Sequence, residues 1–298
     1  MSPKNSSIYL SIADIQIDLK SPLSSAELRI DGLLEPFFGK SQNPAGRILL
    51  EWEESSEILQ GEGELVYDPG VIWRMFKNGE TWCAEISYAD RTAACRKEEV
   101  RCLLFANNAW DRVTLTERRF GHGWHSLLAL GAGELMVRSA MVLSDGIVLH
   151  AAGIDDNGHG IVFSGHSGAG KSTQLDFWIH EPGVIPMTDD RVAVRTLEKG
   201  GAVCYGTPWG GMPHIASNHS VPLKALILLE QDVENRMTLL SPEKAAAMLA
   251  CRAFLPYWDR SLMQRAFLNL DRLVKNTPVY LLRCRAEPSV VDFVRSVL

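Results

Sequence analysis

The sequence predicts an α/β protein in two parts: a β-rich N-terminal domain at residues 1–122 and a second domain at residues 123–298, built around a glycine-rich loop. The length of 298 residues suits two domains, since a domain takes about 150 residues. Short runs of alternating apolar and polar residues fill the first part, whereas helical spacing and longer apolar runs begin near residue 126. These patterns predict half-buried strands in the first part and a mixture of strands and helices in the second.

Strands are predicted in the first part wherever the alternation is clear, as in Ile8–Ile12, Arg47–Glu53 and Arg112–Glu117. Asn78-Gly79 lies between two further runs. Because a tight hairpin turn needs positive φ angles, an Asn-Gly pair predicts a β-hairpin at this point. The first part is therefore expected to be an antiparallel, mainly-β module.

Composition excludes some functions. Lys and Arg number 30 against 36 Asp and Glu, a formal net charge of −6, and a protein that coats a nucleic-acid backbone needs a basic excess instead. No apolar run approaches the roughly 18 residues that span a bilayer, so we expect no membrane partner and a cytoplasmic location. The six cysteines form no C-x-x-C pair, and we expect them to be reduced thiols.

A phosphate-binding loop is the strongest motif of the second part. Residues 165–172 read GHSGAGKS and fit G-x-x-x-x-G-K-[ST], with an apolar strand before them and a predicted helix after them. Small residues let backbone N–H groups close around phosphates, and the helix N-terminus attracts anions. The predicted nucleotide-binding residues are Gly165, His166, Ser167, Gly168, Ala169, Gly170, Lys171, Ser172 and Thr173.

Individual roles follow from the chemistry of this loop. Lys171 is expected to reach the β- and γ-phosphates and the Ser172 hydroxyl to ligate Mg²⁺. His166 has a second interpretation, as a solvent-facing residue without a role in the chemistry. The expected ligands are ATP or another nucleoside triphosphate, together with Mg²⁺.

An acidic pair follows the next predicted strand, Val184–Met187. Asp189 and Asp190 would be brought beside the loop by a strand–helix–strand crossover. Carboxylates there can hold Mg²⁺ or take a proton from an attacking hydroxyl. The alternative is that Asp190 pairs with Arg191 on the surface and that Asp189 alone meets the metal. His150, at the end of an earlier strand, either points into the same site or is a hydrogen-bonded core histidine.

Later segments carry weaker signals. Ser241-Pro242 predicts a helix start, because Ser is a good N-cap and Pro suits the first helical position. The loop 206–211 either forms a flexible wall with Trp209 as an aromatic face or buries Trp209 in the core. A last set of side chains is either a phosphate clamp or ordinary charges on a helix face: Arg260, Arg265 and Arg272.

Across residues 146–298 the segments LHAAGI, FSGHSGAGKST, TDDRVAV, YGTPWGG, VPLKALILLEQ and TPVYLLRC resemble the HPr kinase/phosphorylase-related family of serine kinases. The likeness is strongest to the homologues associated with modified-peptide gene clusters. The resemblance implies a P-loop kinase core of the HPr kinase/phosphoenolpyruvate carboxykinase-like type. By position it implies that His150 is an active-site histidine, Asp189 the catalytic base and Asp190 a support for the metal.

The function expected from motifs and resemblance is an ATP- and Mg²⁺-dependent kinase that phosphorylates a serine-type hydroxyl of a peptide or protein. Two alternatives stay open: a kinase for a small molecule, and a nucleotide-binding regulatory or assembly protein without catalysis. The second alternative gains support because the Glu and Arg-Gly segments of HPr kinases are not found after residue 211. A homo-oligomer also stays open.

Overall fold

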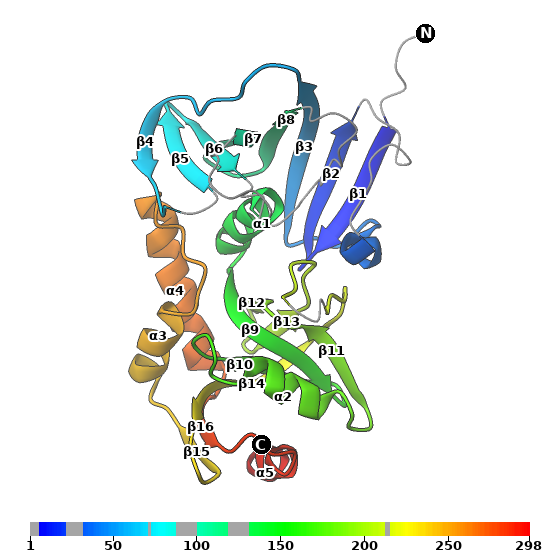
Figure 1. Ribbon diagram of the computed structural model, residues 1–298, viewed down its shortest axis with the longest axis vertical. Helices are drawn as coiled ribbons and strands as arrows, with labels where there is room; N and C mark the ends of the chain where they lie inside the picture. Colours follow the sequence, from blue (N-terminus) through cyan, green and yellow to red (C-terminus); the bar gives the residue numbers. More distant parts are fainter. Residues whose placement is uncertain (1–5, 22–31, 71–72, 88–99, 119–130, 212–214) are drawn as a thin grey trace, which may run out of the picture. The chain divides into compact units, whose positions relative to one another are not determined.

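The computed structural model describes residues 6–21, 32–70, 73–87, 100–118, 131–211 and 215–298 (Figure 1). Its contacts divide the chain into two compact units. One contains Met1–Ala140 and Tyr257–Asp259, and the other contains Met141–Pro256 and Arg260–Leu298. The boundary predicted at residues 122 and 123 lies outside the described residues.

The first unit is an eight-stranded mixed sheet in the order β1-β2-β3-β8-β7-β6-β5-β4. The pairs β2–β3 and β3–β8 are parallel and the other neighbours are antiparallel. The strands are β1 (Ser6–Ile12), β2 (Ile15–Ser21), β3 (Gly46–Ser55), β4 (Glu64–Tyr67), β5 (Trp73–Asn78), β6 (Thr81–Ser87), β7 (Val100–Asn107) and β8 (Arg112–Arg118). A 3-10 helix, η1 (Gly32–Phe37), precedes β3, and α1 (Ala132–Leu143) follows β8.

Alternation along β3 gives this strand one buried face. In β3, Ile48, Leu50 and Trp52 are buried, while the residues between them are exposed. The predicted hairpin is confirmed, since β5 and β6 pair from Asn78 to Thr81 and Gly79 has φ 55°. In β3 a period of two therefore decides which side chains are buried, whereas the residues Trp82–Ile86 of β6 are all buried.

An aromatic cluster belongs to the first unit although part of it comes from much later in the chain. The ring of Trp258 lies 5.4 Å from Trp73, edge to face, and 6.2 Å from Trp110. Tyr257 stacks on Tyr67 at 6.0 Å. Such offset and edge-on contacts add to the free energy gained by burying the rings, so residues 257–259 are an integral part of this unit.

In its described residues the second unit contains eight strands and four helices. The strands are β9 (Gly146–Asp156), β10 (His159–Ser164), β11 (Val184–Thr188), β12 (Arg191–Thr196), β13 (Ala202–Tyr205), β14 (Ser220–Gln231), β15 (Arg236–Leu239) and β16 (Val279–Cys284). The helices are α2 (Lys171–Trp178), α3 (Pro242–Ala250), α4 (Arg260–Asn276) and α5 (Val290–Val297). The predicted helix start is confirmed, because Ser241 Oγ accepts a hydrogen bond from Lys244 N and Pro242 opens α3.

Five strands of this unit close on themselves. The order β10-β9-β12-β13-β14 is completed by parallel pairing of β14 with β10. Closure brings β10 against both β9 and β14. It requires glycine at position 160, because a Cβ on Gly160 would lie 2.3 Å from Cys204 Sγ and 3.1 Å from Pro222 O. The strands β16 and β15 extend the sheet beyond β14.

The predicted fold class, a P-loop α/β kinase core of the HPr kinase/phosphoenolpyruvate carboxykinase-like type, is wrong. The described chain is mainly β, with sixteen strands and five α-helices. In the described residues of the second unit, β10 pairs antiparallel with β9 and parallel with β14 in a closed ring of five strands, so no P-loop α/β core is evident. The local strand–loop–helix segment was predicted. Its strand pairs with β9, which directly precedes it, and with β14, which lies some sixty residues later.

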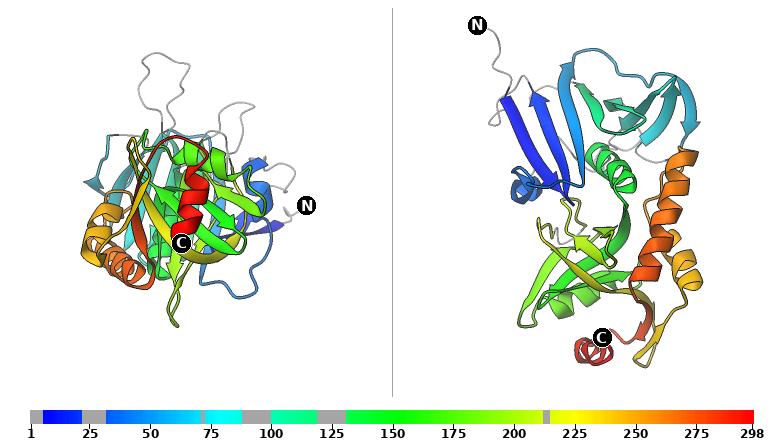
Figure 2. Two further views of the ribbon diagram at one scale, coloured as in Figure 1. Left: turned by 90° about the horizontal axis from the view of Figure 1, so that it is seen from below. Right: turned by 180° about the vertical axis from the view of Figure 1, so that it is seen from behind.

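Helices cover the strands through apolar contacts. Leu175 and Trp178 of α2 share a buried cluster with Phe163 of β10 and with Val290 and Val294 of α5. Helices α3 and α4 lie side by side (Figure 2). Asn269 of α4 is buried and donates hydrogen bonds to Val142 O and Gly146 O, both at 2.9 Å, which ties α4 to the start of β9.

No helix in the described part of the chain combines the length and the apolar character that crossing a membrane requires.

Closure of the five-stranded ring can be tested at Gly160. The variant Gly160→Ala should lower the free energy of unfolding by about 1–3 kcal/mol, because the added methyl group meets Cys204 Sγ and overpacks a tight core. Urea denaturation of Gly160→Ala, Cys204→Ala and the double variant measures this. The double variant should be more stable than the sum of the single effects predicts. Strict additivity would contradict the contact.

Candidate functional site

The glycine-rich loop begins where β10 ends. Ser164 closes the strand and its Oγ donates a hydrogen bond to His150 O at 2.8 Å. A Cβ on Gly165 would lie 2.7 Å from the Cβ of Ala169, so only glycine allows the loop to fold back on itself there. Gly168 and Gly170 have φ values of 80° and 103°, which L-residues adopt at a cost. The loop therefore needs its glycines for shape.

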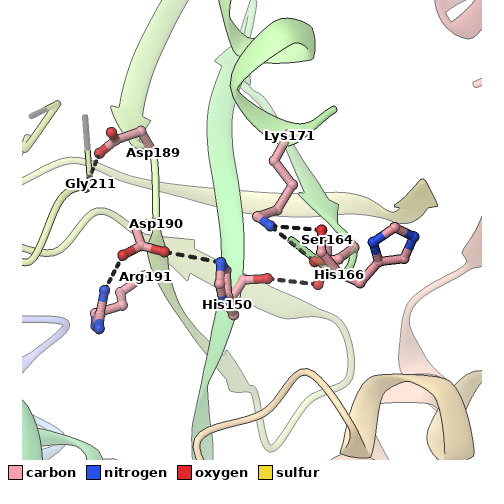
Figure 3. Close-up of polar contacts among 9 residues, drawn as sticks. His150, Ser164, His166, Lys171, Asp189, Asp190, Arg191 and Gly211 are labelled. Carbon is pink, nitrogen blue, oxygen red and sulfur yellow. Dashed lines mark hydrogen bonds and ion pairs between the residues drawn. The ribbon is translucent and has the colours of Figure 1, made fainter. Parts of the chain in front are cut away.

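Lys171 is the first residue of α2 and is buried. Its Nζ donates to Gly165 O at 3.0 Å and to His166 O at 3.4 Å, so the side chain curls back over the loop (Figure 3). Burial lowers the pKa of Lys171, the Asp190 carboxylate acts in the opposite direction, and Arg252 lowers the pKa further. A buried ammonium that loses hydration gains from an anion placed against it.

The remaining loop residues are accessible. His166, Ser167 and Gly168 are exposed, as is Ser172 in the first turn of α2. Because the first turn of a helix has N–H groups without intrahelical partners, its backbone can donate to an anion held over the loop. The Nδ1 of His166 lies 2.7 Å from Ser167 O on the exposed side, which agrees with its interpretation as a solvent-facing residue.

The acidic pair lies at the same edge as the loop. Both β10 and β11 are antiparallel to β9 and therefore run in the same direction, one on each side of it. The loop follows β10, and Asp189 and Asp190 follow β11 directly. The predicted crossover thus exists, but with β9 inserted between its two strands, and His150 of β9 lies between the loop and the acidic pair.

Asp190 is the centre of a small polar cluster (Figure 3). Its Oδ1 lies 3.2 Å from Nε2 of His150, and its Oδ2 accepts from the guanidinium of Arg191. The ring of His150 stacks on Phe254 at 6.2 Å with an interplanar angle of 10°. Asp190 does pair with Arg191, as one alternative held, but it also faces His150 and acts on the charge of Lys171.

Asp189 is 5% exposed, and its Oδ1 accepts a hydrogen bond from Gly211 N at 2.9 Å. Thr207, at the other end of the same loop, donates to Arg191 O at 2.6 Å. The loop 206–211 is therefore fastened to both residues that flank Asp190. Trp209 is buried, so the alternative that placed this ring in the core is the correct one.

The donor set fits Mg²⁺ better than a metal held by protein ligands alone. Within the described residues, no group of three or more His, Cys, Asp or Glu side chains could hold a metal ion. Magnesium usually takes one or two carboxylates, with phosphate oxygens and waters completing its octahedron. Asp190 and the exposed Ser172 hydroxyl are suitable ligands of this kind.

Some side chains of interest lie elsewhere or were not predicted. Arg265 and Arg272 pair with Asp145, at 3.6 and 2.9 Å, which favours their interpretation as helix-face charges. Arg252 and Phe254 border His150, yet no motif in the sequence contains them. The only available signal was their position directly after a predicted helix, which does not indicate a site.

Fold and site together define a class: a two-unit, mainly-β protein whose second unit presents a glycine-rich strand–loop–helix segment beside an acidic pair. The model of the family described as "SynChlorMet cassette protein ScmC" matches residues 125–297. That match covers more than half of the chain, and the chain belongs to this family. A comparison with curated proteins found no significant match.

The resemblance to the HPr kinase/phosphorylase-related family is therefore corrected. The family that matches is ScmC, which is a separate family. The short segments that suggested HPr kinases describe the loop and its neighbouring strands, and local motifs of this kind recur in different families. Roles for His150, Asp189 and Asp190 can no longer be taken from that family and must rest on their geometry.

The loop geometry can be tested by stability alone. Gly170→Ala should lower the free energy of unfolding by about 1–2 kcal/mol, because alanine resists a φ of 103° although space for its Cβ is open. Ser167→Ala, at an exposed position of the same loop, should change it by less than about 0.5 kcal/mol. Equal values for the two variants in urea denaturation would contradict the left-handed conformation of Gly170.

Proposed function

We propose that the protein is an ATP- and Mg²⁺-dependent kinase that transfers the γ-phosphoryl group to a serine-type hydroxyl of a peptide or protein. One observation carries the proposal: Lys171, the loop and the His150–Asp190 pair converge at one edge of the second unit. Anion-binding backbone, a cation and carboxylates within one site are the parts that phosphoryl transfer requires.

The loop is proposed to hold the phosphates of the nucleotide. N–H groups of residues 165–172 and the start of α2 supply donors without any side chain. Lys171, which now donates to two carbonyl groups of its own loop, would turn its Nζ to the β- and γ-phosphates. That exchange replaces neutral acceptors with charged ones and makes stronger hydrogen bonds.

Mg²⁺, when bound, would neutralise charge between the β- and γ-phosphates. We assign Ser172 and Asp190 to hold it, because Asp190 is the carboxylate whose charge acts on Lys171. Arg191 and His150 fix the orientation of the Asp190 carboxylate from two sides. Asp190 is therefore held in place before any ligand arrives.

Asp189 is assigned to the acceptor. In the proposed step the acceptor oxygen attacks the γ-phosphorus, the bond from that phosphorus to the β,γ-bridging oxygen breaks with its electrons moving to ADP, and the hydroxyl proton passes to Asp189. The hydrogen bond from Gly211 N fixes Oδ1, and Oδ2 is the oxygen assigned to the proton. Positioning and electrostatics carry such a transfer.

The choice of a peptide or protein as acceptor rests on exposure of the site. The Asp189 side chain itself is buried, but His166, Ser167, Gly168 and Ser172 of the loop are all exposed. An open loop suits a large acceptor better than an enclosed pocket for a small molecule does. A cavity of about 450 Å³ does occur, but it lies in the first unit against Phe105, Arg112 and Thr114. That cavity is not the closed pocket beside Asp189 that a small-molecule kinase would need.

A cytoplasmic location is part of the proposal. Cys83, Cys102, Cys204, Cys251 and Cys284 are free thiols, and free thiols persist in the reducing compartment. Burial raises the pKa of Cys204 to about 12 and that of Cys83 to about 11. These two side chains therefore stay protonated at neutral pH, and neither is a nucleophile of the proposed reaction.

Lys171→Met should weaken binding of Mg²⁺-ATP by about tenfold or more, because a charge-assisted contact of about 1.5–3 kcal/mol is lost. The fold should survive, since burial already disfavours the lysine charge. Isothermal titration calorimetry measures the affinity. Lys275→Met, at an exposed pair with Asp271 on α4, is the matched control and should bind as wild type does. Equal affinities of the two variants would contradict a role for Lys171.

Asp189→Asn should leave nucleotide binding intact but slow phosphoryl transfer by about 10²–10⁴-fold, the usual contribution of a general base. Asparagine keeps an oxygen that can accept from Gly211 N, so the loop should hold its shape. Radioactive γ-phosphate transfer to peptides and proteins encoded beside this chain measures the rate. Undiminished transfer removes Asp189 as the base. Tight binding by wild type with neither transfer nor hydrolysis would favour the non-catalytic alternative.

A further inference from the structure

Arg252 lies beside the loop although it is distant from it in sequence. Its carbonyl oxygen accepts a hydrogen bond from His150 N at 2.8 Å, and Phe254 N donates to Val148 O at 2.9 Å. Ala253 forms an isolated bridge with Leu149. Residues 252–254 thus line the edge of β9 from residue 150 to residue 148, and β10 lines β9 from Asp156 to Ala151. Arg252 therefore lies on the same edge of β9 as β10, next to the point where β10 ends and the loop begins.

The side chain of Arg252 differs from those of Arg191 and Arg295, which form ion pairs. Arg191 pairs with Asp190, and Arg295 pairs with Asp156 and Glu181. Arg252 donates instead to Met248 O at 2.5 Å, a backbone carbonyl at the end of α3. Among the described residues, its buried Nε has no hydrogen-bond partner and no ion pair joins it to a carboxylate. A half-buried guanidinium of this kind has donors to offer an anion.

Arg252 is close enough to Lys171 for their charges to interact. Its charge and that of Lys171 repel each other, which contributes to the lowered pKa of Lys171. The Asp190 carboxylate offsets part of this repulsion. An anion placed against both cations would stabilise them further. On the opposite side of β9, Arg191 faces His150 in the register of β12. His150 therefore has Arg252 on one side and the Asp190–Arg191 pair on the other.

We propose that Arg252 binds the terminal phosphate of the nucleotide and stabilises that group during transfer. The inference rests on the proposed function and adds a residue to it. The loop backbone and Lys171 surround the phosphates from the side of α2, whereas Arg252 approaches from the side of His150, where the acceptor would enter. Its N–H groups would donate to oxygens of the γ-phosphoryl group and would transfer no proton. The γ-phosphoryl group leaves ADP and joins the acceptor oxygen with Arg252 still charged.

The test compares a ligand that has a γ-phosphate with one that lacks it. Binding of the non-hydrolysable analogue AMP-PNP and of ADP, each with Mg²⁺, is measured by calorimetry for wild type, Arg252→Gln and Arg252→Lys. Arg252→Gln should weaken AMP-PNP binding by about tenfold or more and ADP binding by less than about twofold. Arg252→Lys keeps the charge without the planar guanidinium, so its affinity for AMP-PNP should lie between those of wild type and Arg252→Gln. Arg272→Gln removes an exposed guanidinium and should change neither affinity.

The outcomes test the role of Arg252 separately from the proposed function. An unchanged ratio of AMP-PNP to ADP affinity in Arg252→Gln overturns the inference, whether both affinities fall together or neither does. A wild-type chain that binds neither nucleotide overturns the proposed function itself and the inference with it. Thermal denaturation is recorded for each variant. If Arg252→Gln does not fold, the ratio measured for Arg252→Lys decides, with an unchanged ratio again counting against Arg252.

Discussion

The backbone of β9 around His150 is the constraint on which the candidate site depends. The carbonyl of His150 accepts from Ser164 at the start of the loop, and its N–H donates to Arg252. On its other edge β9 pairs with β12, so that Arg191 lies opposite His150. Three segments that are far apart in sequence are therefore fixed against one residue. A shift of β9 by one position would separate them all, because it turns every side chain to the other face.

The electrostatics of the site agree with the anion binding that we propose. Lys171 and Arg252 repel each other, and burial makes the lysine charge costly. Asp190 offsets part of this charge, but it is shared among His150, Arg191 and Lys171. In a partly buried environment charges interact more strongly than in water, so an incoming phosphate would gain from both cations. Because the Lys171 charge is costly when buried, its Nζ donates hydrogen bonds to the carbonyl oxygens of Gly165 and His166.

Local features could be predicted from the sequence, and features set by distant pairing could not. The hairpin at Gly79, the N-cap at Ser241 and the strand–loop–helix segment each depend on a few adjacent residues. The fold class was wrong because β10 pairs with the distant strand β14, some sixty residues later, in addition to its neighbour β9. No periodicity in the sequence encodes the pairing with β14. Arg252 was not predicted for the same reason, since only its pairing with β9 places it near the loop. Motif order also suggested the wrong family, because short motifs around a glycine-rich loop are shared across folds.

The aromatic cluster around Trp258 has a consequence for dissecting the chain. Residues 257–259 belong to the first unit, although they are flanked on both sides by the second. No single cut yields both units complete: a fragment that ends at residue 140 lacks the ring that packs on Trp73 and Trp110. Expressing the two units as separate polypeptides would therefore leave the first unit incomplete. To express the first unit alone, residues 257–259 would have to be joined to it through a linker or added as a separate peptide.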